Sequence, residues 1–219
     1  VAAASMLVML RNPKHEINIH GLRLWRLDFS MIRRILRLGI PNGLENSIFQ
    51  FGRIIVTGMV AIHGTTAIAA HAVAGSLTGI EVIPGQAIGL ALLTVTAQCM
   101  GAREYGQAKR YARLLTGLSY AAMIALNAVM LLLIRHVIGL YSLSEDAYTL
   151  AVQIMVVHGI GAMLIWPLSF TLPNALRAAG DVKYPMAVSI LSMCLFRIGM
   201  SYIFVYVLHT GPIGVWLAM

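Results

Sequence analysis

The residues most able to take part in chemistry lie on one face of an otherwise apolar stretch, residues 39–60. In a helix, five of its polar side chains fall within an arc of about 80°. They are Asn42, Asn46, Gln50, Arg53 and Thr57. Glu45 lies beside this arc, and the opposite face is made of Ile, Leu, Val and Phe. Because a stretch of this length can cross a bilayer, we expect the polar face to turn toward other helices or water.

Charged side chains at membrane depth are costly, at about 2.5–3.5 kcal/mol each at a helix centre. The sequence places four of them there: Glu45, Arg53, Glu81 and Arg197. One interpretation is that they form ion pairs that fix neighbouring helices, and the other is that they line a path for a substrate or an ion. Pro84 follows shortly after Glu81, where a kink or a broken helix frees backbone carbonyls. A buried Glu81 is also able to take up a proton, because desolvation disfavours the charged carboxylate.

Aromatic and imidazole side chains add further candidates. Trp166 and Phe170 are able to line an aromatic cavity for an organic cation, and the alternative is that they pack or anchor at the interface. His71 and His158 lie in apolar runs, where each either bonds a neighbouring helix or relays a proton. The residues that we expect to line a substrate or ion pathway are Glu45, Asn46, Gln50, Arg53, Glu81, Trp166 and Arg197.

Catalytic arrangements are not evident in the sequence. It contains no GxSxG, HExxH or Walker motif and no cluster of acids in a loop, so we expect no catalytic residues and no enzyme activity. Its two cysteines lie in separate apolar runs without metal-ligand spacing, so we expect no metal site. Arg177 and Asp181 lie in a predicted turn, where we expect a structural role that ties helix ends together.

The elements that position these side chains follow from composition. Hydrophobic residues make up 59% of the chain and charged residues 11%, whereas soluble domains have about 45–50% and about 25%. Long runs with almost no charge are each long enough to span a bilayer. We therefore predict an all-α, polytopic membrane helix bundle. Its spans are expected near residues 39–63, 67–100, 114–134, 147–172 and 184–208, with a truncated span from 213.

The first residues and the loops complete this prediction. Residues 1–10 are typical of the end of a preceding span, so we expect a fragment that is cut within a span at both ends. Residues 11–38 form a basic loop, and its second half, capped by Asp28 or Ser30, is predicted to be an amphipathic helix on an anionic leaflet. Alternate loops hold most of the 16 Lys and Arg residues, so the positive-inside rule places them in the cytoplasm. Because the basic loop leads directly into a span, we expect no nucleic-acid partner.

Several ordered segments resemble one family of membrane proteins. They are residues 38–41, 69–74, 172–181 (LPNALRAAGD) and 214–218, together with Gln98, Gly101, Ala102, Ala108 and Arg197. Over nearly the whole chain, this pattern resembles the C-terminal half of a MATE (multidrug and toxic compound extrusion) protein. The resemblance implies a transporter of two six-helix lobes, in which residues 39–219 form the C-terminal lobe. It also implies export of organic cations and drugs, by alternating access, in exchange for Na⁺ or H⁺.

One feature departs from the family pattern. Some members coordinate a cation in this lobe with one carboxylate midway along its first helix and another on its fourth. Those positions fall near Phe49 and Trp166 in this chain, and neither residue is acidic. The resemblance therefore leaves coupling either to Glu45 and Glu81 or to an acid in the missing N-terminal lobe.

Three functions remain open. The leading hypothesis is a secondary active antiporter of the bacterial inner (plasma) membrane that exports organic cations, drugs or metabolites in exchange for H⁺ or Na⁺, with no other cofactor. Its expected partners are a small-molecule substrate, the lipid bilayer and the missing N-terminal lobe. The alternative is a flippase for a lipid-linked precursor from the same superfamily, which would need several cationic cavity residues. A membrane-embedded enzyme is the third hypothesis, and clustered acids or a nucleophile would indicate it.

Overall fold

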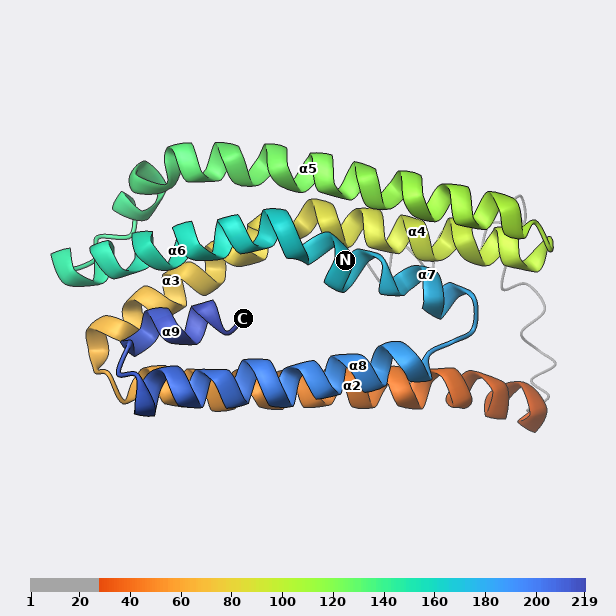
Figure 1. Ribbon diagram of the computed structural model, residues 1–219, viewed down its shortest axis with the longest axis horizontal. Helices are drawn as coiled ribbons and strands as arrows, with labels where there is room; N and C mark the ends of the chain where they lie inside the picture. Colours follow the sequence, from red (N-terminus) through yellow and green to blue (C-terminus); the bar gives the residue numbers. More distant parts are fainter. Residues whose placement is uncertain (1–27) are drawn as a thin grey trace, which may run out of the picture. The chain divides into compact units, whose positions relative to one another are not determined.

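The computed structural model describes residues 28–219, which are helical with short connections and contain no strand (Figure 1). This confirms the predicted all-α class. The elements in chain order are α2 (Phe29–Ala61), α3 (Thr65–Glu81), α4 (Ile83–Gly101), α5 (Tyr105–Gly139), α6 (Glu145–Trp166), the π-helical segment η1 (Pro167–Thr171), α7 (Pro173–Ala178), α8 (Lys183–Ser192), the π-helical segments η2 (Met193–Met200) and η3 (Ile203–Val207), and α9 (Gly211–Leu217).

The chain divides into two compact units, residues 1–39 and 40–219. In the first unit the structure describes only the start of α2. Asp28 caps this helix, because its Oδ1 accepts hydrogen bonds from the backbone N–H groups of Ser30 (2.9 Å) and Met31 (3.2 Å). Asp28 was one of the two caps expected from the sequence. The predicted span end at 1–10 and most of the basic loop at 11–38 lie outside the described residues.

Prolines interrupt two of the long helices in the second unit. Val82 separates α3 from α4, and Pro84 lies in the first turn of α4, where its missing N–H costs no hydrogen bond. The break expected at Pro84 is therefore confirmed, and the interval 67–100 is two helices. At Pro167 the helix widens instead, and the N–H of Leu172 bonds the Pro167 carbonyl five residues back at 3.0 Å.

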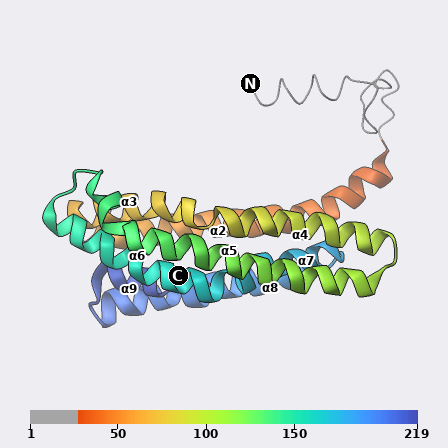
Figure 2. The same cartoon turned by 90° about the horizontal axis from the view of Figure 1, so that it is seen from above.

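Four helices in the described part of the chain are long and apolar enough to cross a membrane: Ile83–Gly101, Tyr105–Gly139, Glu145–Ala178 and Lys183–Val207. Helix α2 carries the polar stripe, and α3 has 17 residues, so these two are not among the four. Helix α5 runs beside α4 in both views, and α6 packs on α3 and α5 (Figures 1 and 2).

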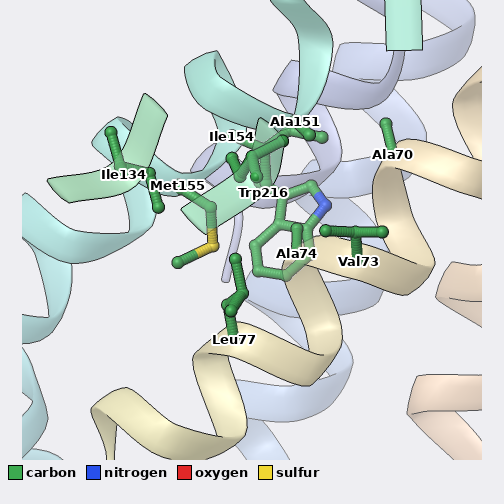
Figure 3. Packing of buried hydrophobic residues seen from close by; sticks show 10 residues of the cluster. Ala70, Val73, Ala74, Leu77, Ile134, Ala151, Ile154, Met155 and Trp216 are labelled. Atoms are coloured by element: carbon green, nitrogen blue, oxygen red, sulfur yellow. The ribbon is translucent and has the colours of Figure 1, made fainter. Parts of the chain in front are cut away.

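The main hydrophobic core lies between α3, α5, α6 and α9. Figure 3 shows Trp216 of α9 among apolar side chains of α3 and α6, with Leu77 and Ile154 on either side. Trp216 is 4% exposed and Ile154 is fully buried. A smaller cluster joins Val56 and Val60 of α2 to α9 and η3. The last helix thus takes part in both clusters, through Trp216 and Val215, and it brings Trp216 to the histidines described below.

Candidate functional site

Glu45 of α2 and Arg177 of α7 form an ion pair. The Arg177 Nη2 donates to Glu45 Oε1 at 2.6 Å, and its Nη1 donates to Asn174 Oδ1 at 3.0 Å. Both side chains are largely buried, with 12% of Glu45 and 21% of Arg177 exposed. The two charges therefore neutralise each other, and neither is left unpaired in an apolar bundle. Asp181 does not take part, because its carboxylate accepts the Tyr184 N–H at 3.2 Å and caps α8.

The polar stripe of α2 divides into two parts. Asn42 and Asn46 border a cavity of about 180 Å³ beside the Glu45–Arg177 pair. Asn46 Nδ2 also donates to the Asn42 carbonyl at 3.0 Å, which leaves the Asn46 Oδ1 as an acceptor for a group in the cavity. Gln50 and Arg53 are exposed and border neither this cavity nor the larger one described next.

Aromatic rings separate this cavity from a larger one of about 360 Å³. Phe170 is stacked on Trp166 with centroids 5.0 Å apart, and it meets Phe49 edge-on at 6.0 Å. The guanidinium carbon of Arg197 lies 5.2 Å from the Phe49 centroid, which is a cation–π contact. Trp166 itself packs on Gly85, whose missing side chain leaves space for the indole ring. Two predicted site residues, Trp166 and Arg197, are thus joined through two phenylalanines.

Glu81 and His158 form a second titratable pair. The carboxylate is fully buried, and its Oε2 lies 3.0 Å from His158 Nδ1. Its other oxygen, Oε1, is buried without a hydrogen-bond partner among the described residues. Glu81 is the last residue of α3, directly before the break at Val82. A fully buried carboxylate with one free oxygen is a candidate for binding a proton or a water.

Trp216 links this pair to His71. Its ring lies edge-on to His158 at 5.5 Å and to His71 at 5.4 Å, and its Nε1–H donates to His71 Nδ1 at 3.2 Å. On the far side of His71, the Nε2 lies 3.4 Å from Thr57 Oγ1, which donates to the Arg53 carbonyl. The polar stripe of α2 therefore reaches the half-buried His71 through Thr57.

Three residues of these contacts have no local sequence signal that marks them as part of a site. In the sequence, Asn174, which orients Arg177, and Trp216, which contacts two histidines, stand out only as parts of the family-like segments 172–181 and 214–218. Phe49 lies near the position where some family members have a carboxylate, and here it contacts both Phe170 and Arg197. A tryptophan and a histidine that lie 145 residues apart give no local signal of contact.

Comparisons with known proteins agree with one another. A family model described as MatE matches residues 41–203. The uncharacterised transporter YisQ of Bacillus subtilis is 25% identical over 219 residues, which are 97% of this chain and 46% of that protein. The probable multidrug resistance protein NorM of Rhodopseudomonas palustris is 29% identical over 227 residues, which are 100% of this chain and 46% of that protein.

Solved structures show the same fold. An outward-facing multidrug resistance MATE family transporter of the MOP superfamily superimposes with a TM-score of 0.87 at 18% identity, covering 99% of this chain and 49% of its own. A MOP superfamily transporter from Pyrococcus furiosus, described as having a binding pocket of reversed polarity, gives a TM-score of 0.86 at 18% identity with the same coverage. The chain therefore spans about half the length of the relatives that it matches.

Proposed function

This chain belongs to the MatE family, and from that premise we propose that it is one lobe of a secondary active antiporter. The antiporter exports organic cations, drugs or metabolites in exchange for H⁺ or Na⁺ by alternating access. The family consists of membrane transporters, in agreement with the four membrane-capable helices and with the expectation of a protein other than an enzyme. In this proposal the protein resides in the bacterial inner membrane, and a second lobe completes the transport path.

The observation that supports this proposal is the pair of cavities beside the polar face of α2. They share a wall that contains Phe49, Ser169, Phe170 and Ser189. The larger, of about 360 Å³, falls within the range of about 300–1,000 Å³ that is typical of sites for small organic molecules. Aromatic faces attract organic cations, and the asparagines of α2 provide hydrogen bonds. Such a mixed wall suits amphiphilic substrates of varied shape.

Dye efflux from vesicles that contain the complete gene product tests the proposal. We expect ethidium export to stop when the ion gradients are collapsed with ionophores, because the gradient supplies the free energy. Phe170→Ala is expected to lower export by opening the shared wall. Leu132→Ala is the matched control, because Leu132 is 81% exposed on α5 and borders neither cavity. Export that continues without any gradient would exclude an antiporter.

One observation favours a second candidate, the flippase for a lipid-linked precursor. Within residues 28–219, Arg53 and Arg197 form no ion pair with a carboxylate. Unpaired guanidinium groups are suited to a pyrophosphate. Growth of a flippase-depleted strain on the complete gene product, lost on Arg197→Gln, would favour this function over drug export.

A further inference from the structure

The Glu81–His158 pair has an unusual charge balance. Both groups are shielded from solvent, with 0% of the Glu81 side chain and 14% of the His158 side chain exposed. A neutral imidazole carries one N–H proton of its own. When the pair binds one further proton, on either the carboxylate or the imidazole, its net charge is zero. Losing the proton leaves a buried carboxylate beside a neutral imidazole, with a net charge of −1 that burial disfavours. The one-proton state is therefore favoured while the site is dry, and hydration makes release possible.

The hydrogen bonds of His71 show that this second histidine stays neutral. An indole N–H is only a donor, so the His71 Nδ1 that receives it must be unprotonated. The remaining proton is then on Nε2 and points to Thr57 Oγ1, whose own proton goes to the Arg53 carbonyl. A proton added to Nδ1 would face the indole N–H and break this arrangement.

The surroundings of the pair contain few other titratable groups. The elements packed on α3 and α6 are α4, α5, α9 and η1, and α2 also contacts α3 through Val56 and Thr57. The charged residue of α2 nearest this contact is Arg53, whose carbonyl accepts from Thr57 and whose side chain is exposed. Helix α5 presents Ile134 and Ile138 to the core, while its Arg135 and His136 are exposed. Helix α4 and η1 contain no Asp, Glu, His, Lys or Arg, and α9 contributes Trp216. Within residues 28–219, no other charged side chain hydrogen-bonds to Glu81 or His158.

We propose that Glu81 and His158 together bind one exchangeable proton and form the proton-coupling site of this lobe, with Trp216 of α9 reporting its state. The inference rests on the proposed antiport and selects H⁺ over Na⁺. On release, the proton passes from the pair to a water molecule that enters at the free Glu81 Oε1, and the pair changes from neutral to −1. On uptake, the proton returns from water of the other compartment. No bond other than those to the proton is made or broken.

The break between α3 and α4 lies beside Glu81, where water must reach the carboxyl group in this cycle. Val82, directly after Glu81, is the residue at which the helix is interrupted. A small change of angle there exposes the carboxyl group to water without unfolding either helix. The same change shifts the edge contacts of Trp216, so the protonation state of the pair is linked to the position of α9.

Fluorescence of Trp216 tests the site without measuring transport. Trp25→Phe and Trp166→Phe leave Trp216 as the single indole of this chain, and every tryptophan of the second lobe is likewise replaced by Phe in the purified complete protein. A change of one unit charge beside the ring shifts its emission, so we expect a single inflection with pH. Glu81→Gln and His158→Gln should each abolish the inflection, whereas His71→Gln should retain it. Helical content by circular dichroism checks that each variant is folded.

The opposite pattern would overturn the inference. An inflection that survives in Glu81→Gln, or that is lost only in His71→Gln, would show that the pair is not the group that titrates. Glu81→Gln keeps the size and most of the hydrogen-bonding capacity of the original, so a purely structural role would leave its folding and the remaining contacts nearly unchanged. His158→Gln keeps a donor and an acceptor but loses the ring that meets Trp216, so Glu81→Gln is the decisive variant.

Transport then separates this inference from the proposed function. A gradient of about one pH unit supports about a tenfold accumulation ratio per proton exchanged. In proteoliposomes of the complete protein we expect such accumulation, and a ratio close to one for Glu81→Gln, while substrate exchange without a gradient continues. Accumulation driven by Na⁺ alone, or unchanged proton-driven accumulation in Glu81→Gln, would overturn the proton site and leave antiport intact. Absence of any gradient-driven transport in the unaltered protein would overturn both.

Discussion

Replacing Arg177 tests whether its ion pair with Glu45 ties α7 to α2. The two charges meet at 2.6 Å and are mostly buried, where a pair at about 4 Å would gain about 4 kcal/mol at an effective dielectric constant of about 20. Because the pair borders a cavity of about 180 Å³, water offsets part of this gain. We expect Arg177→Gln to lower the free energy of unfolding by about 1–3 kcal/mol.

Thermal unfolding of the detergent-purified protein measures this loss. For a cooperative unit of this size, about 1 kcal/mol corresponds to about 2–4 °C, so a loss of about 1–3 kcal/mol gives an expected decrease in Tm of about 2–12 °C. Glu45→Gln should give a similar decrease, and the double variant should lose less than the two single decreases combined. Asp181→Asn is the matched control, because Asp181 is exposed and caps only α8. If the single effects add within about 0.5 kcal/mol, the two residues do not interact energetically and the reasoning is wrong.

Three further substitutions test the packing of the bundle by Tm. Gly85→Ala should destabilise by about 1–3 kcal/mol, because the new Cβ would occupy the space of the Trp166 ring; Gly79→Ala, with no neighbour within 4 Å, should be neutral or stabilising. Ile154→Ala should cost about 2–5 kcal/mol, because Ile154 is fully buried in the main core; an unchanged Tm would contradict the packing described. Asn127→Leu should be neutral or stabilising, because the Asn127 Oδ1 is buried without a partner; a large decrease in Tm would show that this oxygen is bonded.

Much of the fold was predictable from local properties. Apolar runs and prolines act over a few residues, so the helices and the break near Pro84 followed from composition and from the missing N–H. The cap at Asp28 was predictable for the same reason. The π-helical turns were not, because a wide turn differs from an α-turn by a small balance of packing energies. Pro167 signals an irregularity but not its form.

Side-chain pairing across the bundle was harder to predict. The helical period places Glu45 beside a polar stripe, but it does not show that Arg177, 132 residues later, is its partner. Glu81 and His158 are separated by 77 residues and were recognised only as separate intramembrane polar groups. Partner choice depends on which helices pack together, and a single sequence does not encode that in any local pattern. Four charges at membrane depth were expected, and the structure pairs Glu45 and Glu81 with residues outside that set.

The π-helical segment η1 makes the orientation of everything after it depend on one residue of chain length. A wide turn accommodates about one residue more than an α-turn, and one residue corresponds to about 100° of rotation around the axis. If ordinary α-turns ran through Pro167–Thr171 with all five residues kept, α7 would be rotated by about that angle, whereas deleting one residue at the same time would restore its orientation. In the rotated arrangement Arg177 would point away from Glu45 although both residues were still present. The number of residues in the segment Pro167–Thr171 therefore matters for the shared wall of the two cavities as much as the side chains that form this wall.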